Sequence, residues 1–252
     1  MTGPAAAPNA AQIASRAYRL PAFDEAFLLG DSMRGARFMM EFAKADEVLR
    51  AWEIGSTIVV FGSSRITEDG LADHARWYAE ARRFAALASR EGGALTGDGG
   101  PRRNVIATGG GPGIMAAANR GAADVGAPSI GFNISLPQEQ GPNAWSTPEL
   151  TFRFHYFAMR KMHLAMRASA LVVFPGGFGT MDELFEILTL RQTGKMKSVP
   201  VVLVDKAYWT GLIRFETLRE QDFIGPGDLE LIQFAADGAE AWGLLAPLLS
   251  AP

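Results

Sequence analysis

Cysteine is absent from this sequence of 252 residues, and charge of one sign is not in large excess. Without cysteine there is no disulfide, thiolate zinc site or cysteine nucleophile, which fits a reducing compartment. The formal net charge of −3 argues against non-specific binding to nucleic acid or an anionic membrane. No apolar run reaches the roughly 18 residues of a membrane-spanning helix, and the first residues, MTGPAAAPNAAQ, do not resemble a signal peptide. We therefore expect a soluble, cytoplasmic protein that binds neither nucleic acid nor membrane.

Several motifs of catalytic and metal sites are also missing. The three histidines, His74, His155 and His163, form no HExxH pattern and no metal-ligand pair. The only Gly-Lys pair is followed by Met196, so the Walker signature is absent, and there is no GxSxG elbow. The sequence therefore predicts no metal and no bound cofactor, and it disfavours a P-loop protein or a serine hydrolase.

Short apolar runs alternate with helical patterns along most of the chain. The expected strands are 57–61, 104–107, 129–134, 170–174 and 200–204, and the expected helices are 71–91, 112–125, 155–168, 179–193, 207–219 and 237–249. Continuous apolar strands separated by helices are typical of a parallel sheet covered on both faces. The pattern predicts an α/β fold: a Rossmann-like, doubly wound parallel sheet with helices on both faces and an N-terminal helical extension. We expect residues 1–15 to be disordered, 16–55 to form that extension, and 56–252 to form the Rossmann-like domain.

The ends of the expected strands are rich in glycine and serine. They read FGSSR (61–65), ATGGGPG (107–113), FNISLP (132–137) and FPGGFGT (174–180). Ligands of open parallel sheets bind beyond the carboxyl ends of the strands. Glycines let backbone N–H groups approach a ligand, and the start of a helix favours an anion. These loops therefore predict a phosphate site, with glycines that serve only tight turns as the alternative.

A nicotinamide site is the less favoured interpretation of the same loops. The segment from Gly111 to Ala116 matches GxGxxA, part of the dinucleotide fingerprint. Such a site also needs an acid about 20 residues further on for the ribose hydroxyls. Here the next strand ends near Asn133 instead.

Acidic residues follow the last glycine-rich loop. Thr180 and Glu183 have the spacing of a capping box, in which threonine caps the helix and glutamate bonds back to its start. A structural role and a catalytic role for Glu183 both stay open, since a carboxylate in the first turn lies near whatever the loop binds. Asp182 and Glu186 are expected on other faces, in contact with solvent or a partner.

A basic helix precedes that loop in FHYFAMRKMHLAMR (154–167). Arg160, His163 and Arg167 recur at helical spacing, with Lys161 beside the first of them. A solvated basic face is one interpretation. The other is that one end of the helix approaches the phosphate loop.

The segment PGGFGTMDE (175–183) resembles the PGGxGTxxE signature of the LOG ("lonely guy") family. These are nucleoside 5'-monophosphate phosphoribohydrolases that release cytokinin bases, and many were once named lysine decarboxylases. Supporting matches follow in the family's order: GSSR (62–65), TGGGPGIMAAANRGA (108–122), GFNISLPQEQGPN (131–143), FAMRK (157–161) and FEILTLRQTGK (185–195). The resemblance spans roughly residues 56–220. The N-terminal extension and the EQGPN segment resemble the longer, second type of the family.

The resemblance implies roles for individual residues. The family's catalytic pair falls on Arg160 and Glu183. Contacts with phosphate and ribose are implied for Ser63, Arg65, Gly110, Gly111, Gly113, Gly176, Gly177, Gly179 and Thr180, and Asn133 and Lys161 are candidates for base contacts or an accessory role. Two departures leave the base preference open: Phe157-Ala158 replaces the Met-His of plant-type members, and Ala116 replaces a glutamate common in the second type.

The implied activity is hydrolysis of the N-glycosidic bond of cytokinin riboside 5'-monophosphates or AMP to free base and ribose 5-phosphate, without a cofactor. The implied partners are a small nucleotide substrate and other copies of the chain, in a dimer or larger homo-oligomer. The alternative is a protein of the same fold that binds or carries a nucleotide or a molybdenum cofactor without hydrolysis. Intact Arg160 and Glu183 favour the enzyme. A lysine decarboxylase is rejected, because it needs pyridoxal phosphate on a lysine in a suitable context.

Overall fold

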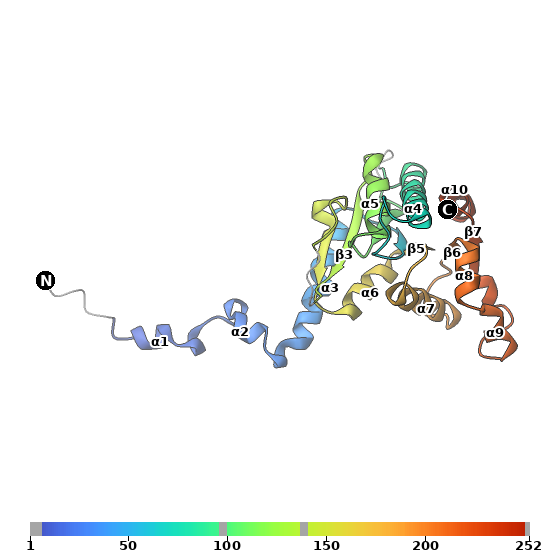
Figure 1. The fold of residues 1–252 in the computed structure, drawn as a ribbon. Helices are drawn as coiled ribbons and strands as arrows, with labels where there is room; N and C mark the ends of the chain where they lie inside the picture. The colour runs from blue at the N-terminus through green and yellow to red at the C-terminus, as the bar shows by residue number, and fades with distance from the viewer. Residues whose placement is uncertain (1–6, 96–99, 137–140, 250–252) are drawn as a thin grey trace. The chain divides into compact units, whose positions relative to one another are not determined.

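The computed structural model describes residues 7–95, 100–136 and 141–249 (Figure 1). The chain forms two compact units, one up to Ala43 and one from Lys44 onward. Within the described residues, no helix combines the length and apolar content needed to cross a membrane.

A parallel sheet forms the centre of the larger unit. In the described part of the chain its order is β4-β3-β2-β1-β5-β6-β7. The strands are β1 (Thr57–Phe61), β2 (Val105–Thr108), β3 (Ser129–Ile134), β4 (Thr151–Phe154), β5 (Ala168–Val173), β6 (Val201–Val204) and β7 (Ile232–Ala235). Every residue of β1, β2 and β6 is buried. Their continuous apolar sequences follow from this burial, because a central parallel strand is covered on both faces.

Helices cover both faces of the sheet, which confirms the predicted doubly wound α/β fold. They are α4 (Ala72–Glu91), α5 (Ile114–Asp124), α6 (Phe157–Met166), α7 (Phe178–Gln192), α8 (Lys206–Leu212), α9 (Phe215–Glu220) and α10 (Gly238–Leu249). Helix α4 packs against both α5 and α10. Figure 1 shows α4 and α5 on one side of the sheet and α6 and α7 on the other. Two short 3-10 helices, Pro148–Leu150 and Asp228–Leu231, precede β4 and β7.

The chain changes direction across the sheet between β4 and β5. It runs outward from β1 through β2 and β3 to β4, then returns to place β5 on the other side of β1. The loops after β1 and β5 therefore meet, and the backbone N–H of Ser63 donates to the carbonyl of Pro175 at 3.0 Å. Such a switch in strand order is where open α/β sheets bind their ligands.

The smaller unit consists of short helices. These are α1 (Ala10–Ala14), α2 (Glu25–Leu28), the 3-10 turns Arg16–Tyr18, Pro21–Phe23 and Asp31–Met33, and the first part of α3 (Arg34–Ala51). Asp24 caps α2 by accepting from the N–H of Phe27 at 3.2 Å. The disorder expected for residues 1–15 stays a prediction, as do the bounds of the extension, and residues 1–6 lie outside the described residues.

The structure adds two strands that the apolar runs do not mark, β4 and β7. Both lie at the ends of the sheet order. β4 exposes Arg153 between buried residues, and β7 is only half-buried over most of its length. An edge strand has one open side, so it needs no continuous apolar run. The single helix expected at 207–219 is also wrong, because Ile213 is extended and separates α8 from α9.

Candidate active site

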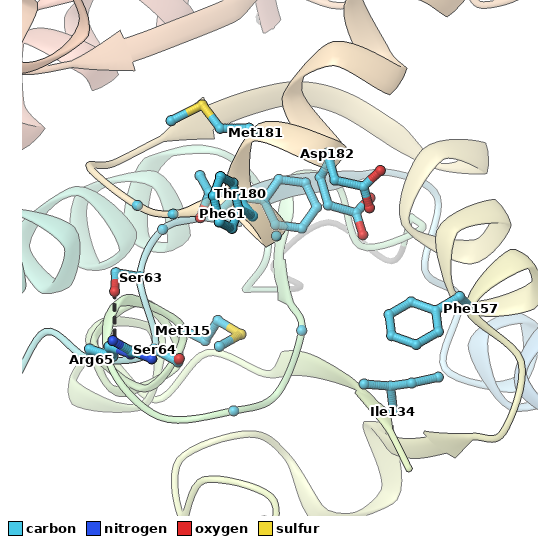
Figure 2. Close-up of a pocket in the computed structure, with 18 of the residues that line it drawn as sticks. Phe61, Ser63, Ser64, Arg65, Met115, Ile134, Phe157, Thr180, Met181 and Asp182 are labelled. Atoms are coloured by element: carbon cyan, nitrogen blue, oxygen red, sulfur yellow. Dashed lines mark hydrogen bonds between the residues drawn. The ribbon is translucent and has the colours of Figure 1, made fainter. Parts of the chain in front are cut away.

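A cavity of about 930 Å³ opens beyond the carboxyl ends of β1, β2, β3 and β5 (Figure 2). Its volume falls in the range of roughly 300–1,000 Å³ that is common for small-molecule sites. Most of the predicted site residues line it: Ser63, Arg65, Gly111, Asn133, Arg160, Gly176, Gly177, Gly179, Thr180 and Glu183. Gly110, Gly113 and Lys161 are not among the residues that line it. The structure thus gathers residues from positions 63 to 183 at one place.

The loop after β5 turns its carbonyl groups toward protein donors. Pro175 accepts from the N–H of Ser63 at 3.0 Å, and Gly177 accepts from the N–H groups of Thr180 and Met181, each at 3.0 Å. Gly176 accepts from the hydroxyl of Tyr208 at 2.7 Å. Three successive carbonyl oxygens are therefore occupied, so their partial negative charges are directed at the protein.

The N–H groups of the same loop have no hydrogen-bond partner among the described residues. In the described part of the chain, no hydrogen bond uses the N–H of Gly176, Gly177, Phe178 or Gly179. Helix α7 begins at Phe178, with Gly177 as its N-cap residue. Free N–H groups at a helix start, beside the positive end of the helix dipole, form a site for an anion.

The predicted capping box is wrong. Helix α7 starts before Thr180, so Thr180 and Glu183 both lie inside the helix, and the N-cap position makes no side-chain hydrogen bond. The Thr180 side chain instead occupies the space where Gly176 would carry a Cβ. Glycine at the cap makes a side-chain cap impossible, which leaves the N–H groups of the first turn available.

The loop after β2 is shaped by glycines that do not all face the cavity. Gly110 and Gly113 have φ of +71° and +70°, the left-handed region that favours glycine. A Cβ on Gly110 would strike the Asn133 side chain. These two predicted contact residues therefore serve backbone conformation and packing.

Asn143 fixes that loop and was not predicted as a site residue. Its N–H donates to the carbonyl of Gly110 at 2.8 Å, and its side-chain amide donates to the carbonyl of Gly111 at 3.1 Å. Asn143 follows the segment 137–140, which lies outside the described residues. Only the resemblance of GFNISLPQEQGPN draws attention to it, since sequence gives no sign that its amide reaches the glycine loop.

Arg160 is held in a defined position at the cavity wall. Its Nε donates to the carbonyl of Phe132 at 2.9 Å. Its guanidinium lies against the backbone of Gly109, in the space that a Cβ there would take. Burial lowers the pKa of this guanidinium, and the carboxylates of Glu183 and Asp182 oppose the shift. An arginine stays protonated throughout the ordinary pH range, so Arg160 is a fixed cation.

Glu183 is a buried carboxyl group that lines the cavity. It is 7% exposed. Burial raises its pKa to about 7, against the opposing charges of Lys161 and Arg160. Among the described residues, no protein group donates a hydrogen bond to its carboxylate. A carboxyl group that titrates near neutral pH in a cleft is typical of a functional site.

Lys161 links α6 to α7. Its ammonium lies 2.8 Å from a carboxylate oxygen of Asp182 and 2.8 Å from one of Glu186. Burial lowers its pKa, but the attraction of the two carboxylates outweighs that effect and the pKa is raised. Asp182 lines the cavity and so does not lie on a separate face, but its side chain is 57% exposed, in line with the expected contact with solvent.

The two ends of the cavity differ in chemistry. Figure 2 shows Ser63, Ser64 and Arg65 at one end, and Phe157 with Ile134 at the other. Met115 lies between the two ends. Sequence alone does not mark these apolar residues as site residues, because isolated apolar side chains are typical of a core. The cavity therefore combines a polar end with an apolar end.

The fold and this site define an α/β protein with a doubly wound parallel sheet and a cavity at the carboxyl ends of its strands, and comparison with known proteins gives the family. The family model described as "Possible lysine decarboxylase" matches residues 115–245. The chain therefore belongs to this family, the LOG family, as the signature predicted.

Curated relatives carry names that state an activity. Cytokinin riboside 5'-monophosphate phosphoribohydrolase LOG3 of Arabidopsis thaliana is 36% identical over 83 residues, which are 32% of this chain and 38% of the relative. The probable phosphoribohydrolase LOG4 of Oryza sativa subsp. japonica is 29% identical over 140 residues, 54% of this chain and 60% of the relative. The match thus spans only 38% of the length of the first relative.

A solved structure shares the fold. The molybdenum cofactor binding protein from the phototrophic bacterium Rippkaea orientalis superposes with a TM-score of 0.52 at 18% identity. The match covers 77% of this chain and 98% of that one. At this identity the likeness concerns the fold alone.

Proposed function

We propose that this protein hydrolyses the N-glycosidic bond of a nucleoside 5'-monophosphate, such as a cytokinin riboside 5'-monophosphate or AMP, to the free base and ribose 5-phosphate. The observation that carries the proposal is the placement of Glu183 and Arg160 on one cavity with the free N–H groups of residues 176–179. The names of the curated relatives support the same reaction.

Glu183 is the proposed group at the sugar. Breaking the bond between C1' and the base nitrogen builds positive charge on the ribose ring, and water must add to C1'. An ionised carboxylate stabilises that charge and accepts the proton of the attacking water. With a pKa of about 7, Glu183 is ionised in a large fraction of molecules at neutral pH and still basic enough to take a proton.

Arg160 is the proposed group at the leaving base. The electron pair of the broken bond goes to the base, which becomes negatively charged until it gains a proton. The guanidinium is already fixed by Phe132 and Gly109, so it needs no reorganisation to stabilise that charge. It acts by its charge, because guanidinium hardly loses its proton.

The loop of residues 176–179 is the proposed site of the 5'-phosphate. Its free N–H groups and the start of α7 bind the anion, and Ser63 and Arg65 lie at the same, polar end of the cavity. The base then extends toward Phe157 and Ile134. The binding energy of the phosphate is thereby used to position C1' for attack by water.

Turnover of matched substrates tests the proposal. AMP and isopentenyladenosine monophosphate are each incubated beside the unphosphorylated nucleoside, and free base is resolved by chromatography. We expect base from the monophosphates only, and a loss of about 100-fold or more in Glu183→Ala and in Arg160→Ala. Glu149→Ala, which changes an exposed carboxylate, is the matched control and should keep the wild-type rate.

Other outcomes would favour a carrier protein or a mechanism without Glu183. Tight binding of a nucleotide or of a molybdenum cofactor without release of base would indicate a carrier protein. Release of base at wild-type rates by Glu183→Ala would remove Glu183 from the mechanism. A homo-oligomer in the cytoplasm stays our expectation, and light scattering on the purified protein measures the oligomeric state.

A further inference from the structure

Tyr208 contacts the phosphate loop from outside the family signature. It lies in the first turn of α8, after β6, and it lines the cavity. Its hydroxyl donates to the carbonyl of Gly176 at 2.7 Å. This contact joins residues 32 positions apart in the chain.

The ring of Tyr208 is held in place by aromatic neighbours. Trp77 of α4 contacts it edge to face, with ring centroids 5.8 Å apart and an interplanar angle of 70°. Trp209 does the same at 5.2 Å and 89°. Such pairs contribute beyond their buried area. The hydroxyl therefore has little freedom to leave Gly176.

The start of α8 is fixed as well. Asp205 adopts φ of +71°, a left-handed conformation that costs energy for a residue with a Cβ. Its carboxylate caps α8 by accepting from the N–H of Tyr208 at 3.2 Å. The same carboxylate accepts from Trp77 Nε1 at 2.9 Å and from Arg76 at 2.6 Å. Contacts with α4 thus hold the residue that places Tyr208.

The peptide between Gly176 and Gly177 is the one that this contact orients. Its C=O and N–H point in opposite directions, because the peptide is planar and trans. With the C=O directed at Tyr208, the N–H of Gly177 points away from Tyr208. A peptide between two glycines has few steric restraints, so it can rotate and present its carbonyl oxygen to an anion.

We propose that Tyr208 is a positioning residue that holds the Gly176–Gly177 peptide with its N–H toward the phosphate of the ligand. The proposal rests on the proposed function, since it assumes a 5'-phosphate at this loop. Tyr208 acts on the reaction only through the loop and needs no contact with the reacting atoms.

Tyr208→Phe is the test variant, because it removes the hydroxyl and keeps the ring against Trp77 and Trp209. The probes are ribose 5-phosphate and adenine, measured by calorimetry or by inhibition. We expect the affinity for ribose 5-phosphate to fall roughly three- to tenfold, the size of one hydrogen bond, with KM for the monophosphate raised to a similar degree. The affinity for adenine should not change, since the base lies at the apolar end.

Tyr78→Phe is the matched control. Tyr78 is buried and does not line the cavity, so the variant also removes the hydroxyl of a packed tyrosine, away from the proposed phosphate site. It should bind ribose 5-phosphate as the wild type does. Unchanged affinity for ribose 5-phosphate in Tyr208→Phe, or an equal loss for adenine, would overturn the positioning role. A wild-type protein that binds no ribose 5-phosphate would instead overturn the proposed function, and this inference with it.

Discussion

Glu183→Gln should stabilise the protein by an amount that grows with pH. The pKa of Glu183 is raised by burial to about 7, from 4.5 for an ordinary glutamate. Between these values the folded protein holds a proton that the unfolded chain has released. Stability therefore falls as pH rises from about 4.5 to about 7, and the full cost remains at higher pH. Glutamine does not ionise, so Glu183→Gln removes this loss of stability.

The magnitude follows from the shift. A displacement of about 2.5 pKa units corresponds to roughly 3 kcal/mol above pH 7. At about pH 5 only a small part of that cost is present. The difference in unfolding free energy between Glu183→Gln and wild type should therefore grow by about 2.5 kcal/mol between about pH 5 and about pH 8.5.

Denaturant unfolding at these two pH values measures the effect. Glu149→Gln makes the same chemical change at an exposed site and should show no such growth. The variant should also lose turnover, because the amide cannot accept the proton of water. A difference in unfolding free energy that is the same at both pH values would refute the assignment of a raised pKa to Glu183.

Three further predictions concern neighbouring residues. Gly109→Ala places a methyl group against the side-chain ends of Arg160 and Met115, so the fold should persist while the guanidinium of Arg160 moves. Turnover should fall about 100-fold, and the substitution should cause no further loss in the Arg160→Ala background. Additive losses in this double-mutant cycle would contradict the contact between Gly109 and Arg160. Gly179→Ala should raise or keep the unfolding free energy, since alanine favours a helix by about 1 kcal/mol over glycine. It should also lower the affinity for ribose 5-phosphate, measured by calorimetry, roughly tenfold or more. Unchanged affinity would exclude this loop as the phosphate site. Lys161→Met removes a cation that lowers the pKa of Glu183, so the acid limb of the pH profile of kcat/KM should move to higher pH. Lys161→Arg keeps the charge and should stay close to wild type. A profile that does not move would show that Lys161 does not influence the pKa of Glu183.

The fold was predictable where burial was complete. The central strands are continuous apolar runs because helices cover both of their faces, and such runs stand out in a sequence. β4 and β7 were missed because an edge strand keeps polar or half-exposed positions. The division of α8 from α9 depends on one extended residue, Ile213, which no periodicity marks.

The loops that form the candidate site were predictable from the sequence, but the hydrogen bonds within the site were not. The family resemblance carried Arg160 and Glu183, and the structure places both on one cavity. Tyr208 and Asn143 escaped, because each acts through a hydrogen bond to a carbonyl far away in the chain. The capping-box interpretation failed because the helix begins at Phe178, before Thr180, and its N-cap residue, Gly177, has no side chain to cap with.

Four of the site's glycines form two pairs that sequence alone does not separate. Gly110 and Gly113 have positive φ and neighbours that a Cβ would strike, so the fold itself requires glycine there. Gly177 and Gly179 have neither feature: a Cβ on either would meet nothing within 4 Å, and both line the cavity. Local structure gives no reason for glycine at these two positions. The space that their missing side chains leave is open to the cavity, which supports the proposed phosphate site at the start of α7, while the loop after β2 lies against Arg160 and Asn133.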